Sequence, residues 1–404
     1  MKIVRKQRWF LIIGVFVLIM IGCGGKTGEN QEIAQKTVVS KVPSEKEQMR
    51  EKYDSDTEYI AKLYWDIYDQ AAQMGSLSEL EVVRSIVKRI GEHGYVVVDE
   101  ENQIDMVGSE QVLRFCKSVE KEQEAKLTII VVTNDGGLIR YDFHTIGGMV
   151  DVVRGYYQPI DGTLENRGTV SYLADSWEYT KEGYLLFEGS YYSESYYVLS
   201  LAEEPEHKAI RVMPLDKTCR ELNRKYLLPV GYKVNNLFLI DWSEEDFGNL
   251  DFYDLFDRFY PEIYEQPVSF TDDGFGAELV YRIPAEIFES VIEDHFKIDN
   301  KELQKKTIYF SEDETYEYRP RGVDAVEYPD IPYPEVVNYT KNSDGTLTLI
   351  VNAVYPEENT SRAYTHKVVV RPLDDTSFQY VSNQIIFPED GCDLWWHSER
   401  SIKE

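Results

Sequence analysis

Residues 127–144 read LTIIVVTNDGGLIRYDFH, and this stretch decides the type of fold. Its first seven residues are apolar or β-branched, a composition that is typical of a strand. The turn sequence Asn-Asp-Gly-Gly at 134–137 comes next and favours a hairpin. Beyond the turn the side chains alternate, with Ile139, Tyr141 and Phe143 on one face and Arg140, Asp142 and His144 on the other. We therefore predict an antiparallel hairpin here.

Helical periodicity precedes this hairpin, and both kinds of pattern return after it. Apolar residues recur at spacings of three and four in residues 45–74, 78–91 and 109–124, which predicts three helices. Further strands are expected near residues 147–158, 169–179, 184–192, 195–201 and 209–213. Further helices are expected near 216–225, 251–260 and 284–296, before a last β-rich stretch at 335–387. This order predicts an α+β fold with antiparallel sheets.

Two segments of the chain echo each other. Residues 207–218 read HKAIRVMPLDKT, and residues 366–376 read HKVVVRPLDDT. In each half of the chain helices come first and hairpins last. We predict two α+β modules, residues 45–228 and residues 229–404, and the echo indicates an internal duplication. Coincidence stays open as the alternative, because strands that end in a turn with proline and aspartate are common.

The composition describes a folded and strongly acidic protein. The 404 residues carry a formal net charge of −29, from 72 acidic and 43 basic side chains. A charge of this sign repels phosphate backbones and argues against nucleic acid as a partner. Aromatic residues make up 13% of the chain, and such side chains bury large areas and favour strands.

The N-terminal segment is organised like an export signal. Residues 1–8 are basic, and residues 9–22 form an apolar run that is shorter than the roughly 20 residues of a transmembrane helix. The sequence MIGC at 20–23 follows and resembles the lipobox of bacterial lipoprotein precursors, with methionine where leucine is commonest. This resemblance implies cleavage after Gly22 and a lipid on Cys23 that anchors the mature chain.

Loss of this signal peptide would leave a tethered and more acidic chain. Residues 1–22 hold four cations and no acid, so their removal takes the net charge from −29 to −33. Residues 23–44 lack an apolar period and are expected to form a flexible tether. The predicted location is the extracytoplasmic face of the cell membrane. An uncleaved anchor helix with an incidental cysteine is the alternative.

The sequence contains no recognisable catalytic or metal-binding motif. The six histidines lack the spacing of a zinc site, and no serine-nucleophile elbow is present. We therefore predict no catalytic residue, no metal and no cofactor. Cys116 is expected in the apolar face of a helix, and a disulfide between Cys219 and Cys392 is left open.

Acidic and aromatic clusters supply the remaining candidate sites. Asp251, Asp254 and Asp257 recur every third residue between aromatic side chains, which predicts a helix with a buried aromatic face and a solvated acidic face. Trp395 and Trp396 are candidates for stacking on a ligand. The preferred function is a non-enzymatic binding protein of the envelope, with a glycan or protein partner. The alternative is a carboxylate-dependent enzyme that acts on glycan or peptidoglycan.

Three further segments carry a resemblance to a known family. They are RELNRKYLLPVGY at 220–232, DWSEEDFGNLDFYDLFDRFYP at 241–261 and RPLDDTSFQYVSNQII at 371–386. The chain resembles a family of lipoproteins from Gram-positive anaerobes that is described as a domain of unknown function. The resemblance covers most of the mature chain and implies no activity, ligand or site residue.

Overall fold

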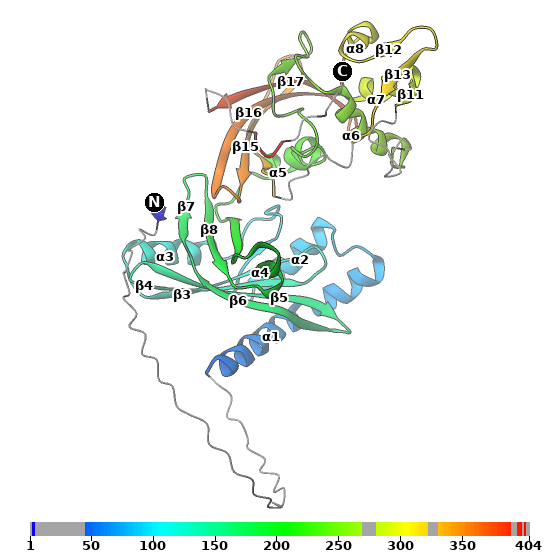
Figure 1. Cartoon of the computed structure of the whole chain (residues 1–404). Helices are drawn as coiled ribbons and strands as arrows, with labels where there is room; N and C mark the ends of the chain where they lie inside the picture. The colour runs from blue at the N-terminus through cyan, green and yellow to red at the C-terminus, as the bar shows by residue number, and fades with distance from the viewer. Residues whose placement is uncertain are drawn as a thin grey trace, which may run out of the picture.

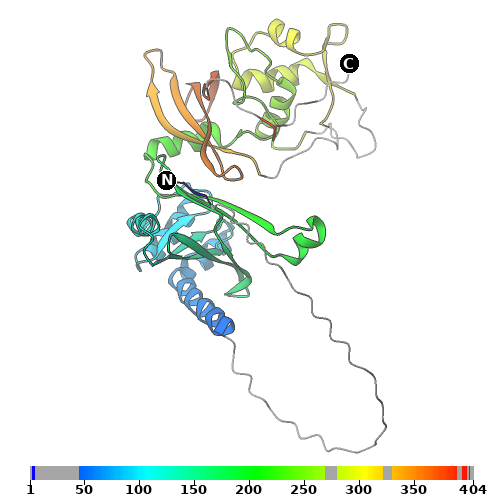
Figure 2. The same cartoon turned by 60° about the vertical axis from the view of Figure 1, so that its left-hand side comes forward.

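The protein is described from a computed structural model, which forms two parts that are stacked on each other (Figures 1 and 2). The structure describes residues 2–4, 45–268, 280–321, 330–388, 394–397 and 400. Gly22 and Cys23 of the predicted lipobox, the predicted tether at 23–44 and Cys392 lie outside the described residues, and so does the predicted signal peptide except for residues 2–4. The elements form an α+β fold with mainly antiparallel sheets, as predicted.

The N-terminal part is built on the sheet that contains the predicted hairpin. The helices are α1 (Glu45–Met74), α2 (Leu80–Gly91) and α3 (Ser109–Glu120), and the sheet has the order β2 (Val96–Asp99), β3 (Ala125–Val132), β4 (Leu138–Ile146), β5 (Met149–Ile160) and β6 (Thr163–Leu173). β2 is parallel to β3, and the other neighbours are antiparallel. The hairpin of β3 and β4 is therefore confirmed.

Both faces of this hairpin are covered. Tyr141 and Phe143 are buried in a core that includes residues of α3 and of a second sheet. The opposite face packs against α1 and α2. There Arg140 is also buried, and its guanidinium donates hydrogen bonds to Asp142 and to Thr57 on α1. Arg140 can therefore be buried on this face, because it pairs with Asp142 beneath α1.

The second sheet follows directly in the chain and corrects one prediction. Its order is β1 (Lys2–Val4), β7 (Ser176–Tyr179), β8 (Tyr184–Tyr191) and β9 (Glu204–Arg211). The strand predicted at 195–201 is wrong, because α4 (Glu194–Ser200) connects β8 to β9. The Ser193 side chain caps this helix by accepting a hydrogen bond from the Tyr196 backbone, and Leu201 ends it in a left-handed conformation. Local capping therefore overrides the β propensity of the aromatic residues.

The C-terminal part packs helices on one large sheet. The helices are α5 (Lys217–Leu222), which continues into a π-helical turn at Asn223–Leu227, α6 (Phe252–Tyr264), α7 (Ala285–His295) and α8 (Asn300–Lys306). The large sheet has the order β10 (Trp242–Ser243), β17 (Phe378–Phe387), β16 (Thr360–Pro372), β15 (Leu347–Tyr355) and β14 (Tyr333–Lys341). A small sheet has the order β11 (Tyr281–Pro284), β13 (Thr315–Tyr318) and β12 (Tyr309–Phe310). Their shared core also takes in Cys219 and Tyr226.

The two echoed segments occupy different positions in their sheets. The first begins within β9, at the edge of its sheet, and the second begins within β16, between β15 and β17. Both strands nevertheless follow an antiparallel hairpin, β7–β8 and β14–β15. The duplication and the module boundaries stay predictions. None of the helices formed by the described residues is long and apolar enough to cross a membrane.

Candidate ligand-binding cleft

A cavity of about 580 Å³ opens where the two parts meet. Its N-terminal wall comes from β5, from the end of β8 and from α4 and β9. Its C-terminal wall comes from residues 330–333, which lead into β14, and from residues 355–357, which follow β15. We call this cavity the cleft. Its lining combines tyrosines with charged side chains.

A hydrogen-bonded network forms the N-terminal wall. Glu206 is 4% exposed, and its Oε1 lies 3.3 Å from the Arg154 guanidinium and accepts a 3.0 Å hydrogen bond from the Tyr141 hydroxyl. Arg154 also donates to the Tyr191 hydroxyl at 3.1 Å. Burial raises the pKa values of Tyr141 and Tyr172, and the charge of Glu206 raises them further. The Oε2 atom of Glu206 accepts no hydrogen bond from any described residue.

His207 connects the two walls of the cleft. Its Nδ1 lies 3.3 Å from Glu188 on β8, and its Nε2 lies 3.7 Å from Glu357 of the C-terminal part. Glu357 lines the cleft together with His207. His207 therefore lies between carboxylates of the two parts of the fold.

The two predicted stacking residues lie in different environments. Trp396 is 5% exposed and packs in the C-terminal core. Trp395 is 47% exposed, donates a 2.9 Å hydrogen bond to Glu358, and has its ring centre 6.3 Å from that of Tyr355 in the cleft wall. The stacking prediction therefore rests on Trp395, which stands beside the cleft.

The helix α4 contributes one residue to the lining of the cleft. Tyr196 from this helix lines the cavity, whereas Tyr197 does not. The outer surface of the same connection is apolar, since Val198 is 71% and Leu199 is 87% exposed. A ligand in the cleft would therefore meet Tyr196 of α4.

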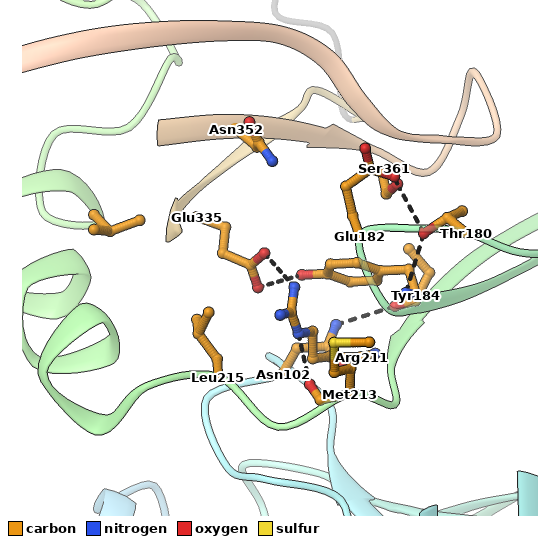
Figure 3. Close-up of polar contacts among 12 residues, drawn as sticks. Asn102, Thr180, Glu182, Tyr184, Arg211, Met213, Leu215, Glu335, Asn352 and Ser361 are labelled. Carbon is orange, nitrogen blue, oxygen red and sulfur yellow. Dashed lines mark hydrogen bonds and ion pairs between the residues drawn. The ribbon is translucent and has the colours of Figure 1, made fainter. Parts of the chain in front are cut away.

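A buried ion pair joins the two parts next to the cleft (Figure 3). Arg211 at the end of β9 donates a 2.5 Å hydrogen bond to Glu335 of β14, which also accepts a 2.7 Å bond from the Tyr184 hydroxyl. Asn102 accepts a bond from the Arg211 backbone and donates one to the Tyr333 hydroxyl. Burial raises the pKa of Glu335, while the charge of Arg211 opposes the rise.

Further polar contacts continue this junction. The Asn359 side chain donates a 2.6 Å bond to Ser176, and the Ser361 hydroxyl lies 3.1 Å from that of Thr180 (Figure 3). All four of these side chains are buried. Because buried polar groups need specific partners, the junction fixes one relative placement of the two walls.

The acidic cluster of α6 forms a buried ion network away from the cleft. Asp254 is 3% exposed and accepts hydrogen bonds from Arg321 and Arg400, and Arg400 also binds Asp257. Asp251 caps the helix by accepting hydrogen bonds from two backbone N–H groups. The prediction of a solvated acidic face is therefore wrong for Asp254, because arginines from distant segments cover and neutralise it.

The described cysteines are free and unreactive. Cys116 and Cys219 are buried thiols, and burial raises their pKa values to about 12 and about 11. Cys392, the candidate disulfide partner of Cys219, lies outside the described residues, so that pairing stays an open prediction. Among the described residues, no group of three metal-ligating side chains is placed to hold an ion.

Sequence reasoning did not identify the residues of the cleft. Arg154 lies in the largely apolar strand sequence VDVVRGYY and Glu335 lies in YPEVVNYTK, whereas Glu206 lies in the mainly charged strand sequence EPEHKAIR. A charged residue inside an apolar strand is a signal, because such a side chain is rarely buried without a partner. The signal indicates burial, but it does not name the partner.

The fold and the cleft define an α+β protein with a polar cavity of ligand size at the junction of its two parts. The chain belongs to a family of unknown function, DUF6070, whose model matches residues 50–400. Comparisons with curated proteins and with solved structures find no match.

Proposed function

We propose that the protein is a lipoprotein of the cell envelope that binds a ligand in the cleft. Its lipid anchor would be attached to Cys23, and the folded part would face away from the cytoplasm. The lipobox-like sequence at 20–23 supports the anchor. The absence of a catalytic motif from the sequence favours binding over chemistry.

The observation that carries the binding function is the cleft itself. Its volume of about 580 Å³ falls within the range of roughly 300–1,000 Å³ that is usual for ligand sites. The cleft lies between two parts of the fold, where such sites are common. The buried junction of Arg211 and Glu335 would hold the walls in place before the ligand arrives, which reduces the entropy cost of binding.

A glycan array and a pull-down with the soluble chain from Gly24 onward test this function. The informative variants are Tyr196→Ala, which changes the cleft wall, and Tyr197→Ala, which removes an exposed tyrosine next to it. We expect Tyr196→Ala to abolish capture of the ligand and Tyr197→Ala to retain it. Equal capture by both variants would place the ligand elsewhere and refute binding in the cleft.

One feature favours the alternative of a carboxylate-dependent enzyme. Glu188 and Glu357 lie close to the two ring nitrogens of His207, so the fold brings carboxylates from distant segments together beside the cleft. Hydrolysis of a glycosidic bond needs two carboxyl groups on either side of that bond. Release of reducing ends from purified peptidoglycan, lost in Glu357→Gln and kept in Glu358→Gln, would establish the enzyme and exclude the simple binding protein.

A further inference from the structure

We propose that the ligand of the cleft carries a protonated amine, an inference that rests on the proposed binding function. The first argument is the charge of the lining. Four carboxylates line the cleft against two permanent cations, Arg154 and Lys208; the carboxylates are those of Glu204, Glu206, Asp330 and Glu357. The field of a chain with a net charge of −29 adds to this preference for a cation.

The second argument is that Arg154, the arginine of the cleft, already has partners. It binds Glu206 and the Tyr191 hydroxyl, and its guanidinium lies 5.1 Å from the centre of the Tyr191 ring. An anionic ligand that bound Arg154 would therefore have to displace existing pairs, whereas a cation would not.

The third argument is that one acceptor of the cleft is incompletely used. Glu357 lies 3.7 Å from His207, which is longer than a hydrogen bond, and its side chain is 37% exposed. An ammonium group has three donors and no acceptor, so it matches this carboxylate. The tyrosine rings of the lining also favour a cation.

Matched pairs of small probes test the inference by isothermal titration calorimetry on the soluble chain. Glucosamine is compared with N-acetylglucosamine, and putrescine with N-acetylputrescine, since acetylation removes one positive charge and keeps the skeleton. Glucuronate serves as the anionic probe. We expect the amine of each pair to bind at least tenfold more tightly than its acetylated form, with weaker binding at high salt.

Two variants that each lose one negative charge show whether the preference for an amine arises in the cleft. Glu357→Gln changes the cleft, and Glu110→Gln removes an exposed carboxylate from α3. We expect Glu357→Gln to weaken amine binding about tenfold and Glu110→Gln to leave it unchanged. An equal effect of both variants would mean a nonspecific charge effect and would overturn the inference.

The outcomes separate this inference from the proposed function. If N-acetylglucosamine or glucuronate binds as tightly as the amines, and Tyr196→Ala abolishes that binding, the cleft is a binding site and only the amine inference fails. If no amine binds at millimolar concentration, the inference also fails. If ligand capture in the array is the same in Tyr196→Ala and Tyr197→Ala, the proposed function fails together with the amine inference.

Discussion

Acid should destabilise the C-terminal part through one buried histidine, His366. Its Nδ1 lies 2.7 Å from Oδ1 of Asn383, and its Nε2 lies 2.9 Å from the Tyr232 hydroxyl. The Asn383 amide nitrogen donates to the Ile240 carbonyl, so its oxygen faces the histidine. The neutral ring with a proton on Nδ1 satisfies all of these contacts. A second proton on Nε2 would remove the acceptor for Tyr232.

The magnitude follows from the shift in the pKa. Burial lowers the pKa of His366 from 6.5 to about 4. Between these values the unfolded chain binds a proton that the folded chain does not bind, so the free energy of unfolding falls as the pH falls. The loss from this group amounts to about 3 kcal/mol by pH 4, and only about 0.4 kcal/mol more is lost below that value.

Urea denaturation of the soluble chain at several pH values between 7 and 4 measures this effect. His366→Gln keeps a donor and an acceptor but does not titrate. We expect the wild-type protein to be the more stable at pH 7 and its advantage to shrink by about 3 kcal/mol at pH 4. Other buried groups titrate in both proteins and cancel in the difference. Parallel stability curves for the two proteins would refute the assignment of a neutral, buried His366.

Three further predictions concern the junction, the surface and the anchor. Glu335→Gln should lower the free energy of unfolding by about 3–5 kcal/mol, because Arg211 stays buried without its counter-charge; thermal and urea unfolding measure this, and a loss below 1 kcal/mol would contradict it. Leu199→Ser should change stability by less than about 0.5 kcal/mol, since the side chain is 87% exposed, and an unchanged melting temperature checks this. Cys23→Ala should move the protein from the membrane fraction to the soluble fraction; retention in membranes, together with a native amino terminus that is intact and free of lipid, would contradict the lipid anchor.

The elements that were predicted correctly have strong local signals. The hairpin of β3 and β4 combines β-branched residues, a turn sequence and clean alternation within 18 residues, and the helix at 285–295 begins directly after a proline. The strand predicted at 195–201 is wrong because its aromatic residues favour a strand, whereas the Ser193 cap starts a helix there. In a seven-residue helix the cap and the left-handed end decide the conformation, and periodicity has too few residues to show itself.

The acidic cluster of α6 failed for a different reason. Asp254 and Asp257 recur between the aromatic residues of one helix, which is typical of a solvated acidic face. The helix sequence alone cannot distinguish such a face from one that is buried in ion pairs. The arginines that bury Asp254 lie 67 and 146 residues further along the chain. Long-range pairing of this kind depends on the fold as a whole.

The cleft could not be predicted from local sequence, because its walls come from strands that are more than 100 residues apart. Arg154 and Glu335 are charged residues within largely apolar strands, so each position indicates a buried charge that needs a partner, whereas Glu206 lies in a mainly charged strand and gives no such signal. An apolar pair in place of Arg211 and Glu335 would serve stability equally well, because buried ion pairs rarely exceed hydrophobic contacts in net free energy. The directional hydrogen bonds of this pair fix the placement of one wall against the other, which apolar contacts would not do. We therefore interpret the charged residues of these strands as serving the geometry of the cleft, which a ligand needs, more than the stability of the fold.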